Sequence, residues 1–133
     1  MRTIRDVMHG EMEVLRTTQT AADAACFLAA HGEDAVPLCQ HDGSLAGMVS
    51  NRDIVAQVVA KGRDPRQVSL AEFAGAADVV ALDIDVPLAE AVAVMCRNER
   101  ARVPVLQGDR VVGSVTRRDV ARCISFQAPW ADD

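Results

Sequence analysis

Aromatic residues are almost missing from this chain of 133 residues. Phe, Trp and Tyr together make up 3% of it, and Tyr is absent, whereas half of the residues are hydrophobic. The core must therefore consist of aliphatic side chains, chiefly Ala, Val, Leu, Ile and Met. A chain of this length and hydrophobic content is expected to bury a sizeable core in one compact fold.

Positive charge is also scarce, and Lys61 is the single lysine. The formal net charge is -5. Proteins that bind nucleic acid need a basic surface to neutralise phosphates, so this balance argues against nucleic acid as the main partner. A local basic pocket for one small anion is still compatible with it.

Long apolar runs are missing too. No stretch approaches the roughly 20 apolar residues that a membrane-spanning helix needs. Residues 1–6, Met-Arg-Thr-Ile-Arg-Asp, also lack the apolar run of a signal peptide. We therefore expect a cytoplasmic protein with no membrane partner.

The cysteines form no C-x-x-C pair, which argues against a zinc knuckle or a thioredoxin-type motif. Cys26, Cys96 and Cys123 fall in expected helices and are predicted to be small buried hydrophobes. Cys39 ends an expected strand and is predicted to be the most exposed of the four. Together with His41 it would supply only two ligands, so no metal site is predicted. The histidines show no nucleophile–base order, so no catalytic residue is predicted.

The chain repeats itself at an interval of 66 to 67 residues. Pro37 and Pro104 stand 67 apart, and Asp53 and Asp119 stand 66 apart. The second copy is therefore one residue shorter between these two positions. The missing residue falls in a turn, where insertions and deletions are tolerated. Apolar positions at i, i+3, i+4 and i+7 of one helix also recur 67 residues later. They are Ala21, Ala24, Ala25 and Leu28, and then Leu88, Ala91, Val92 and Met95.

Each copy is predicted to fold in the order β-α-β-β-α, which makes the fold class α/β, or more closely α+β. The expected elements are 12–15, 20–31, 35–39, 45–49 and 51–60, then 79–82, 87–97, 102–106, 110–115 and 117–124. Short helical lead-ins are expected at 3–8 and 69–74. The corresponding division is a first motif over 1–61, a linker over 62–68, a second motif over 69–125 and a loose tail over 126–133.

One copy is too small to bury both faces of its sheet. Two copies are therefore expected to pack sheet against sheet and share a core, as a pseudo-two-fold pair with two equivalent clefts. Gly47 and Gly113 lie at matching positions of the two hairpins, and larger residues there are expected to crowd the hairpin.

Each copy carries a hydroxyl residue at the end of a strand and an Asp three residues later, in the first turn of a helix. The pairs are Ser50 with Asp53 and Thr116 with Asp119. A helix N-terminus suits a phosphate, the hydroxyl can donate to it, and the carboxylate can accept both hydroxyls of a ribose. The same spacing is also a capping box, so the residues alone leave two interpretations open. The arginines that could balance phosphate charge are Arg52, Arg117 and Arg118.

Both copies resemble the CBS domain, the unit named after cystathionine β-synthase. The resemblance lies in residues 3–8, in the proline segments 35–38 and 102–105, and in the strand-to-helix stretches 47–55 and 113–121. It covers about residues 3–125. The chain resembles a stand-alone tandem pair, or Bateman module, of the kind that includes the small hypoxic response proteins.

The resemblance implies a regulatory, non-catalytic module with a role in stress response. Such pairs bind AMP, ADP, ATP or S-adenosylmethionine in the clefts between the copies, and need no other cofactor. The hydroxyl and Asp residues would contact phosphate and ribose, and Val36 and Val103 would line the base pocket. Homodimers that pair through their helices are also implied. The alternative is a ligand-free homodimer that binds an unidentified protein partner, with the motifs serving only as helix caps.

Overall fold

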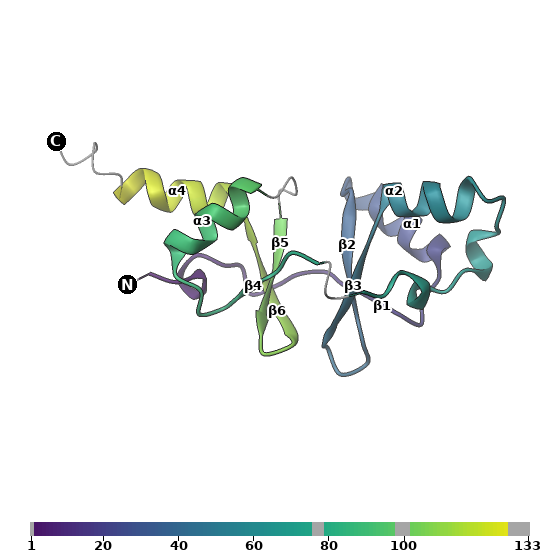
Figure 1. Cartoon of the computed structure of the whole chain (residues 1–133), viewed down its shortest axis with the longest axis horizontal. Helices are drawn as coiled ribbons and strands as arrows, with labels where there is room; N and C mark the ends of the chain where they lie inside the picture. The colour runs from purple at the N-terminus through teal and green to yellow at the C-terminus, as the bar shows by residue number, and fades with distance from the viewer. Residues whose placement is uncertain (1, 76–78, 98–101, 128–133) are drawn as a thin grey trace. The chain divides into compact units, whose positions relative to one another are not determined.

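The computed structural model describes residues 2–75, 79–97 and 102–127, of which residues 123–127 are described by their backbone alone. The chain forms two compact units. The first-copy unit is Glu13–Val79, and the second-copy unit combines Met1–Met12 with Val80–Asp133. Each unit is built around its own three-stranded sheet (Figure 1). The part of the predicted tail beyond residue 127 lies outside the described residues.

The first-copy unit has the sheet order β1-β2-β3. Strand β2 pairs in parallel with the short strand β1 and antiparallel with β3, which follows it in a hairpin. The elements are β1 (Leu15–Arg16), α1 (Ala21–His31), β2 (Ala35–Cys39), β3 (Leu45–Ser50) and α2 (Asn51–Ile54).

The second-copy unit repeats this arrangement with the sheet order β4-β5-β6. Its elements are β4 (Leu82–Asp83), α3 (Leu88–Arg97), β5 (Arg102–Gln107), β6 (Arg110–Thr116) and α4 (Arg117–Gln127). The predicted α+β class and the β-α-β-β-α order are therefore confirmed in both copies. Among the described residues, no helix is long and apolar enough to cross a membrane.

The first strand of each copy is shorter than predicted and begins later. The register pairs Leu15 with Leu38, and continuing it backwards would place Val14 beside Pro37. Proline has no N–H to donate to a neighbouring strand, so pairing on that side stops there. Pro104 limits β4 in the same way, because Leu82 pairs with Val105.

The last helix of the first copy also departs from the prediction. It is α-helical only over Asn51–Ile54 and continues as a π-helix over Val55–Val59. The Ala60 N–H accordingly donates to the Val55 carbonyl at 2.8 Å. Three of the five π-helical residues are β-branched valines, which crowd the turns of an ordinary α-helix.

The lead-in of each sequence copy packs on the other copy. The N–H groups of Ile4 and Arg5 donate to carbonyls of Val86 and Ile84 in the second-copy unit, both at 3.0 Å. The Leu70 N–H donates in turn to the Gln19 carbonyl of the first-copy unit at 2.8 Å. The lead-ins form 3-10 turns over Ile4–Asp6 and Leu70–Phe73. The compact units therefore differ from the division at 61 and 69 that the repeat suggests.

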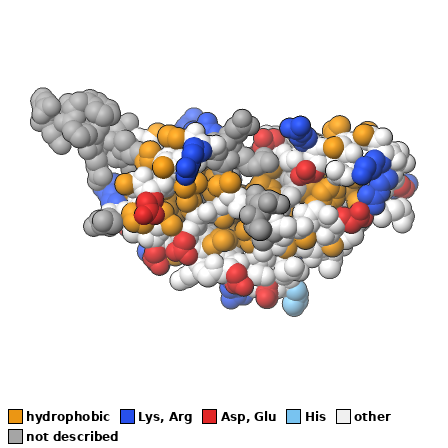
Figure 2. Space-filling view, in the orientation of Figure 1, with side chains coloured by type: hydrophobic (Ala, Val, Ile, Leu, Met, Phe, Trp, Pro, Cys, Tyr) orange, Lys and Arg blue, Asp and Glu red, His pale blue; other side chains and the backbone are white. Residues whose placement is uncertain are grey.

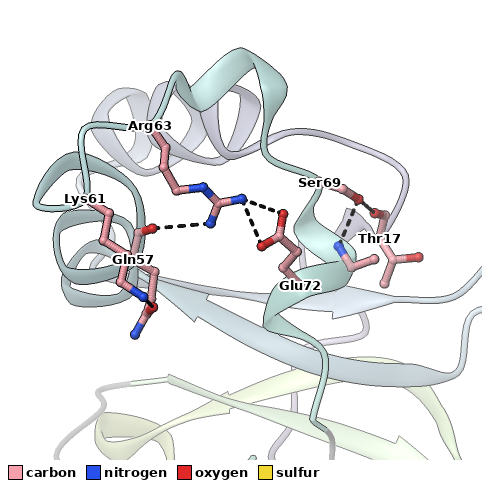
Figure 3. A network of polar contacts seen from close by, with 7 residues as sticks. Thr17, Gln57, Lys61, Arg63, Ser69 and Glu72 are labelled. Carbon is pink, nitrogen blue, oxygen red and sulfur yellow. Dashed lines mark hydrogen bonds and ion pairs between the residues drawn. The ribbon is translucent and has the colours of Figure 1, made fainter.

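The segment predicted as a linker is an ordered part of the first-copy unit. It contains the 3-10 turn Pro65–Gln67, and Val68 at its end is 1% exposed in the core. Polar contacts hold the chain around it in place (Figure 3). One guanidinium nitrogen of Arg63 donates to both carboxylate oxygens of Glu72, at 2.9 and 3.0 Å. The Ser69 hydroxyl donates to the Thr17 carbonyl at 3.1 Å.

Each unit has its own aliphatic core, and one face of each long helix supplies part of it. In α1 the buried positions are Ala21, Ala24 and Leu28, and in α3 they are Leu88, Ala91 and Met95. These are the predicted stripes, apart from Ala25 and Val92, which are half-buried against the cores.

The cysteine predictions were wrong for the three side chains that the structure describes. Cys26 and Cys96 are exposed because they stand off the apolar stripes of their helices, and Cys39 is 2% exposed. Its strand is the middle one of its sheet, which covers it on both edges. Burial raises the pKa of the Cys39 thiol, against the lowering effect of Arg16. The side chain of Cys123 lies outside the described part of the chain.

Gly47 and Gly113 lie under the exchanged lead-ins. A Cβ atom on Gly113 would overlap the carbonyl oxygen of His9, and one on Gly47 would lie 2.9 Å from the Gly75 nitrogen. A larger residue would therefore collide with the lead-in segment rather than with the partner strand of the hairpin. The glycines are needed for this close approach of two backbones.

We expect Gly113→Ala to lower the free energy of unfolding by about 1–3 kcal/mol, the usual cost of overpacking. Gly10→Ala is the matched control, because a Cβ there meets nothing within 4 Å and its φ is not positive. Urea denaturation of the full chain measures both. Equal free energies of unfolding for the two variants would contradict the close approach of Gly113 to the His9 backbone.

Candidate functional site

The candidate site of each unit is the junction where the last strand of its sheet meets the following helix. Strand β3 ends at Ser50 and α2 begins at Asn51, while β6 ends at Thr116 and α4 begins at Arg117. Ser50 is extended, with φ -119° and ψ 166°, so its side chain can turn back to cap the helix. The sheet therefore fixes each hydroxyl at a helix N-terminus.

Both junctions form complete capping boxes. The Ser50 N–H donates to Asp53 Oδ2 at 2.9 Å, and the Asp53 N–H donates to Ser50 Oγ at 3.1 Å. The Thr116 N–H donates to Asp119 Oδ2 at 2.9 Å, and the Asp119 N–H donates to Thr116 Oγ1 at 3.1 Å. The capping interpretation that the sequence left open is therefore correct as a structural role.

The Ser50 box differs from the box that opens α1. There the Thr20 hydroxyl donates to Asp23 Oδ2 at 3.1 Å, so this donor is already engaged. Among the described residues, the Ser50 hydroxyl donates to no acceptor, whereas the Thr116 side chain hydrogen-bonds to the Asp119 carboxylate. One oxygen of each Asp carboxylate, Oδ1, receives no bond from this part of the chain. The first junction thus retains a donor and an acceptor for a ligand, and the second retains an acceptor.

The predicted arginines all lie at the surface. Arg52 lies two residues after Ser50, and Arg117 and Arg118 directly follow Thr116. All three arginines are exposed, whereas Ser50 is only 8% exposed. Charge on the molecule is otherwise mixed, and both signs occur on each unit in the face drawn in Figure 2. The role of these arginines in balancing phosphate charge stays a prediction.

Val36 and Val103 lie in the hydrophobic cores. Their side chains are 1% and 0% exposed, and they pair across the hairpins with Val49 and Val115. They therefore present no open side-chain surface in this structure. Their assignment to a base pocket stays a prediction.

One residue at the second junction was missed by sequence reasoning. His9 Nε2 lies 3.0 Å from Asp119 Oδ2, and the two side chains are 61% and 14% exposed. Burial by itself raises the pKa of Asp119. Hydrogen bonds from the backbone and side chain of Thr116, together with the charge and hydrogen bond of His9, outweigh burial and hold that pKa below its usual value.

The only signal in the sequence was the repeat itself. An offset of 66 aligns His9 with Gly75. The residue that follows the first lead-in therefore carries an imidazole, whereas the equivalent residue after the second lead-in has no side chain.

No metal centre is assigned. Among the described residues, no three His, Cys, Asp or Glu side chains lie close enough together to hold an ion. Of the pair that the sequence singled out, Cys39 is buried in its sheet and His41 is exposed in the hairpin turn.

Similar proteins agree with this architecture. Hypoxic response protein 1 of Mycobacterium tuberculosis is 34% identical over 122 residues, which cover 92% of this chain and 85% of that protein. Its crystal structure, with two coordinated zinc ions, has a TM-score of 0.78 and covers 92% of this chain and 99% of that one. The zinc ions are a property of that protein.

Two further solved structures share the fold. CBSX2 in complex with AMP is 19% identical with a TM-score of 0.74, covering 96% of this chain and 98% of that one. The CBS domain pair of protein MJ0100, in complex with methylthioadenosine and S-adenosyl-L-methionine, is 23% identical. Its TM-score is 0.69, covering 95% of this chain and 98% of that one.

The sequence pattern of the CBS domain matches residues 4–60 and 74–125, one stretch in each copy. These two stretches contain every element of both sheets and both junctions. They leave out the 3-10 turns of residues 65–73, which pack on the first-copy unit. The family pattern matches twice, and the two sheets have the same topology. This chain therefore belongs to the CBS domain family and is a tandem CBS pair.

Proposed function

We propose that this chain is a regulatory module that binds an adenosyl ligand, of the class AMP, ADP, ATP or S-adenosylmethionine, at its strand-to-helix junctions. The observation that carries the proposal is the carboxylate oxygen that each junction leaves without a bond from the described residues, together with the unengaged hydroxyl of Ser50. The bound AMP of CBSX2 and the bound S-adenosyl-L-methionine of MJ0100 support it, because both proteins share the fold.

The chemistry follows from the two groups that each junction offers. The Ser50 hydroxyl sits at a helix N-terminus, where a phosphate is stabilised by the helix dipole and by backbone N–H groups. Asp53 Oδ1 accepts from a ribose hydroxyl while Oδ2 continues to cap the helix. Thr116 and Asp119 take the same roles in the other unit, where the Thr116 hydroxyl turns from the carboxylate to the phosphate. Arg52, Arg117 and Arg118 then offset the phosphate charge.

The proposal assigns binding and regulation, not catalysis. A ligand changes a partner or the assembly only through different affinities for two states. The protein therefore senses the cellular concentration of the adenosyl ligand, because binding shifts the population towards one conformation or oligomer.

Isothermal titration with AMP, ATP and S-adenosylmethionine tests the proposal, with Asp53→Asn as the variant. Asn at this position keeps an oxygen to accept from the Ser50 N–H but loses the charge that binds ribose. Losing a charge-assisted hydrogen bond of about 1.5–3 kcal/mol should weaken affinity about ten- to a hundredfold.

Asp23→Asn is the matched control, because it occupies the same capping position in a box whose hydroxyl is already used. It should bind as tightly as the wild type. The absence of saturable binding by any of the three ligands, in a folded protein, would instead favour the ligand-free interaction module.

We also propose that two copies of the chain associate through the helix that follows the first junction. Val55 and Val59 are 58% and 63% exposed, the largest exposed fractions among the large hydrophobic residues that the structure describes. They stand four residues apart in one helical stretch and so share a face. A second copy that presents the same face would bury both valines, in keeping with a homodimer.

The double variant Val55→Gln/Val59→Gln should shift the protein from dimer to monomer in analytical ultracentrifugation. The control Ala56→Gln/Ala60→Gln places the same side chains, with the same spacing, at exposed positions of the same segment. Loss of the dimer in the control alone, or a monomeric wild type, would refute this interface.

A further inference from the structure

We infer that the two junctions are not equivalent: the Ser50–Asp53 junction is the open, tight site, and His9 acts at the Thr116–Asp119 junction as a built-in competitor for the carboxylate. This inference rests on the proposed function and adds which junction takes the ligand first. It is carried by the contact of His9 with Asp119 and by its lack of a counterpart in the other unit.

The backbone of His9 is clamped to β6. Its N–H donates to the Ser114 carbonyl at 2.8 Å, and the Ser114 N–H donates back to the His9 carbonyl at 2.9 Å. The Ser114 side chain, in a residue 1% exposed, donates to the Glu11 carbonyl at 2.9 Å. Gly113 lets the segment lie this close. The imidazole therefore stands beside the junction as a consequence of the fold.

The contact uses the acceptor capacity of Asp119. Its Oδ2 receives the Thr116 N–H at 2.9 Å and faces His9 Nε2 at 3.0 Å. A carboxylate oxygen has two lone pairs, so this oxygen is saturated and only Oδ1 remains for a ribose. A ligand whose two ribose hydroxyls bind one to each carboxylate oxygen must displace the imidazole. Because His9 is 61% exposed, that displacement leaves the imidazole in water rather than in the core.

The first-copy unit has no described imidazole beside its Asp53 carboxylate. Asp53 Oδ2 accepts only the Ser50 N–H, and no described side chain pairs with the Asp53 carboxylate. The lead-in that crosses β3 there presents Ala74, which bridges to Gly47, and then Gly75. Neither residue has a side chain that can reach a carboxylate. At the position of Ser114 the first copy carries Met48, which has no hydroxyl for the clamp.

The test is isothermal titration of the full chain with AMP at one fixed pH. The wild type should show two classes of site whose Kd values differ by at least about tenfold, as expected when one site must give up a charge-assisted hydrogen bond. Asp53→Asn should remove the tight class, and Asp119→Asn should leave it. His9→Ala should tighten the weak class about tenfold, so that the two classes merge.

Two further variants control for other effects of the substitution. His41→Ala removes an exposed imidazole from a hairpin turn and should leave both classes unchanged. His9→Gln keeps a donor for Asp119 and should behave as the wild type. Thermal denaturation of each variant shows whether it is folded, and the clamp of His9 uses only its backbone atoms.

The inference and the proposed function fail in different ways. Two equal sites in the wild type that His9→Ala leaves unchanged, or weaker binding in His9→Ala, would overturn the inference and leave adenosyl binding standing. No AMP binding by any folded variant would overturn both.

Discussion

The exchange of lead-in segments between the two sequence copies is the constraint on which the rest of the structure depends. Ile4, from the start of the chain, is 0% exposed in the core of the second-copy unit, and Leu70 is equally buried in the first. Each core is therefore completed by a segment that belongs in sequence to the other copy. The same exchange sets the glycines of the two hairpins against a crossing backbone and brings His9 to Asp119.

The junctions show how one set of atoms can serve both folding and binding. A capping box satisfies N–H groups that the first turn of a helix leaves without partners. At Ser50 the box closes with backbone donors alone, so among the described residues the hydroxyl hydrogen and one carboxylate oxygen have no partner. At Thr20 the same two backbone donors close the box, and the hydroxyl donates to the Asp23 carboxylate in addition. The cap and the ligand site are thus compatible roles at Ser50.

Local patterns in the sequence predicted the local structure well. The 66–67-residue repeat, the helical stripes and the hydroxyl–Asp spacing correspond to the two sheets, the buried faces of α1 and α3, and the caps. The misses depended on contacts between distant residues. The exposure of Cys39 was misjudged because its burial comes from β1 and β3 on either side. The exchange was missed because both lead-ins match each other in sequence, so the repeat cannot tell which sheet each one joins.

The role of His9 could not be found from the sequence for the same reason. Asp119 lies 110 residues away along the chain and meets His9 only through the clamp on Ser114. For Val36 and Val103 the position was predicted but the burial was not. The proline segments that carry the resemblance place them correctly on β2 and β5, but these segments do not predict how deeply the two side chains are buried.

The central claim is that the junctions bind an adenosyl ligand. A titration of the isotope-labelled chain with AMP, followed by backbone amide chemical shifts, tests it most directly because it reports binding and location together. The account predicts saturable changes that are largest at the amides of Ser50 to Asp53 and of Thr116 to Asp119. Unchanged spectra, or saturable changes confined to other segments such as the 41–44 turn, would contradict it.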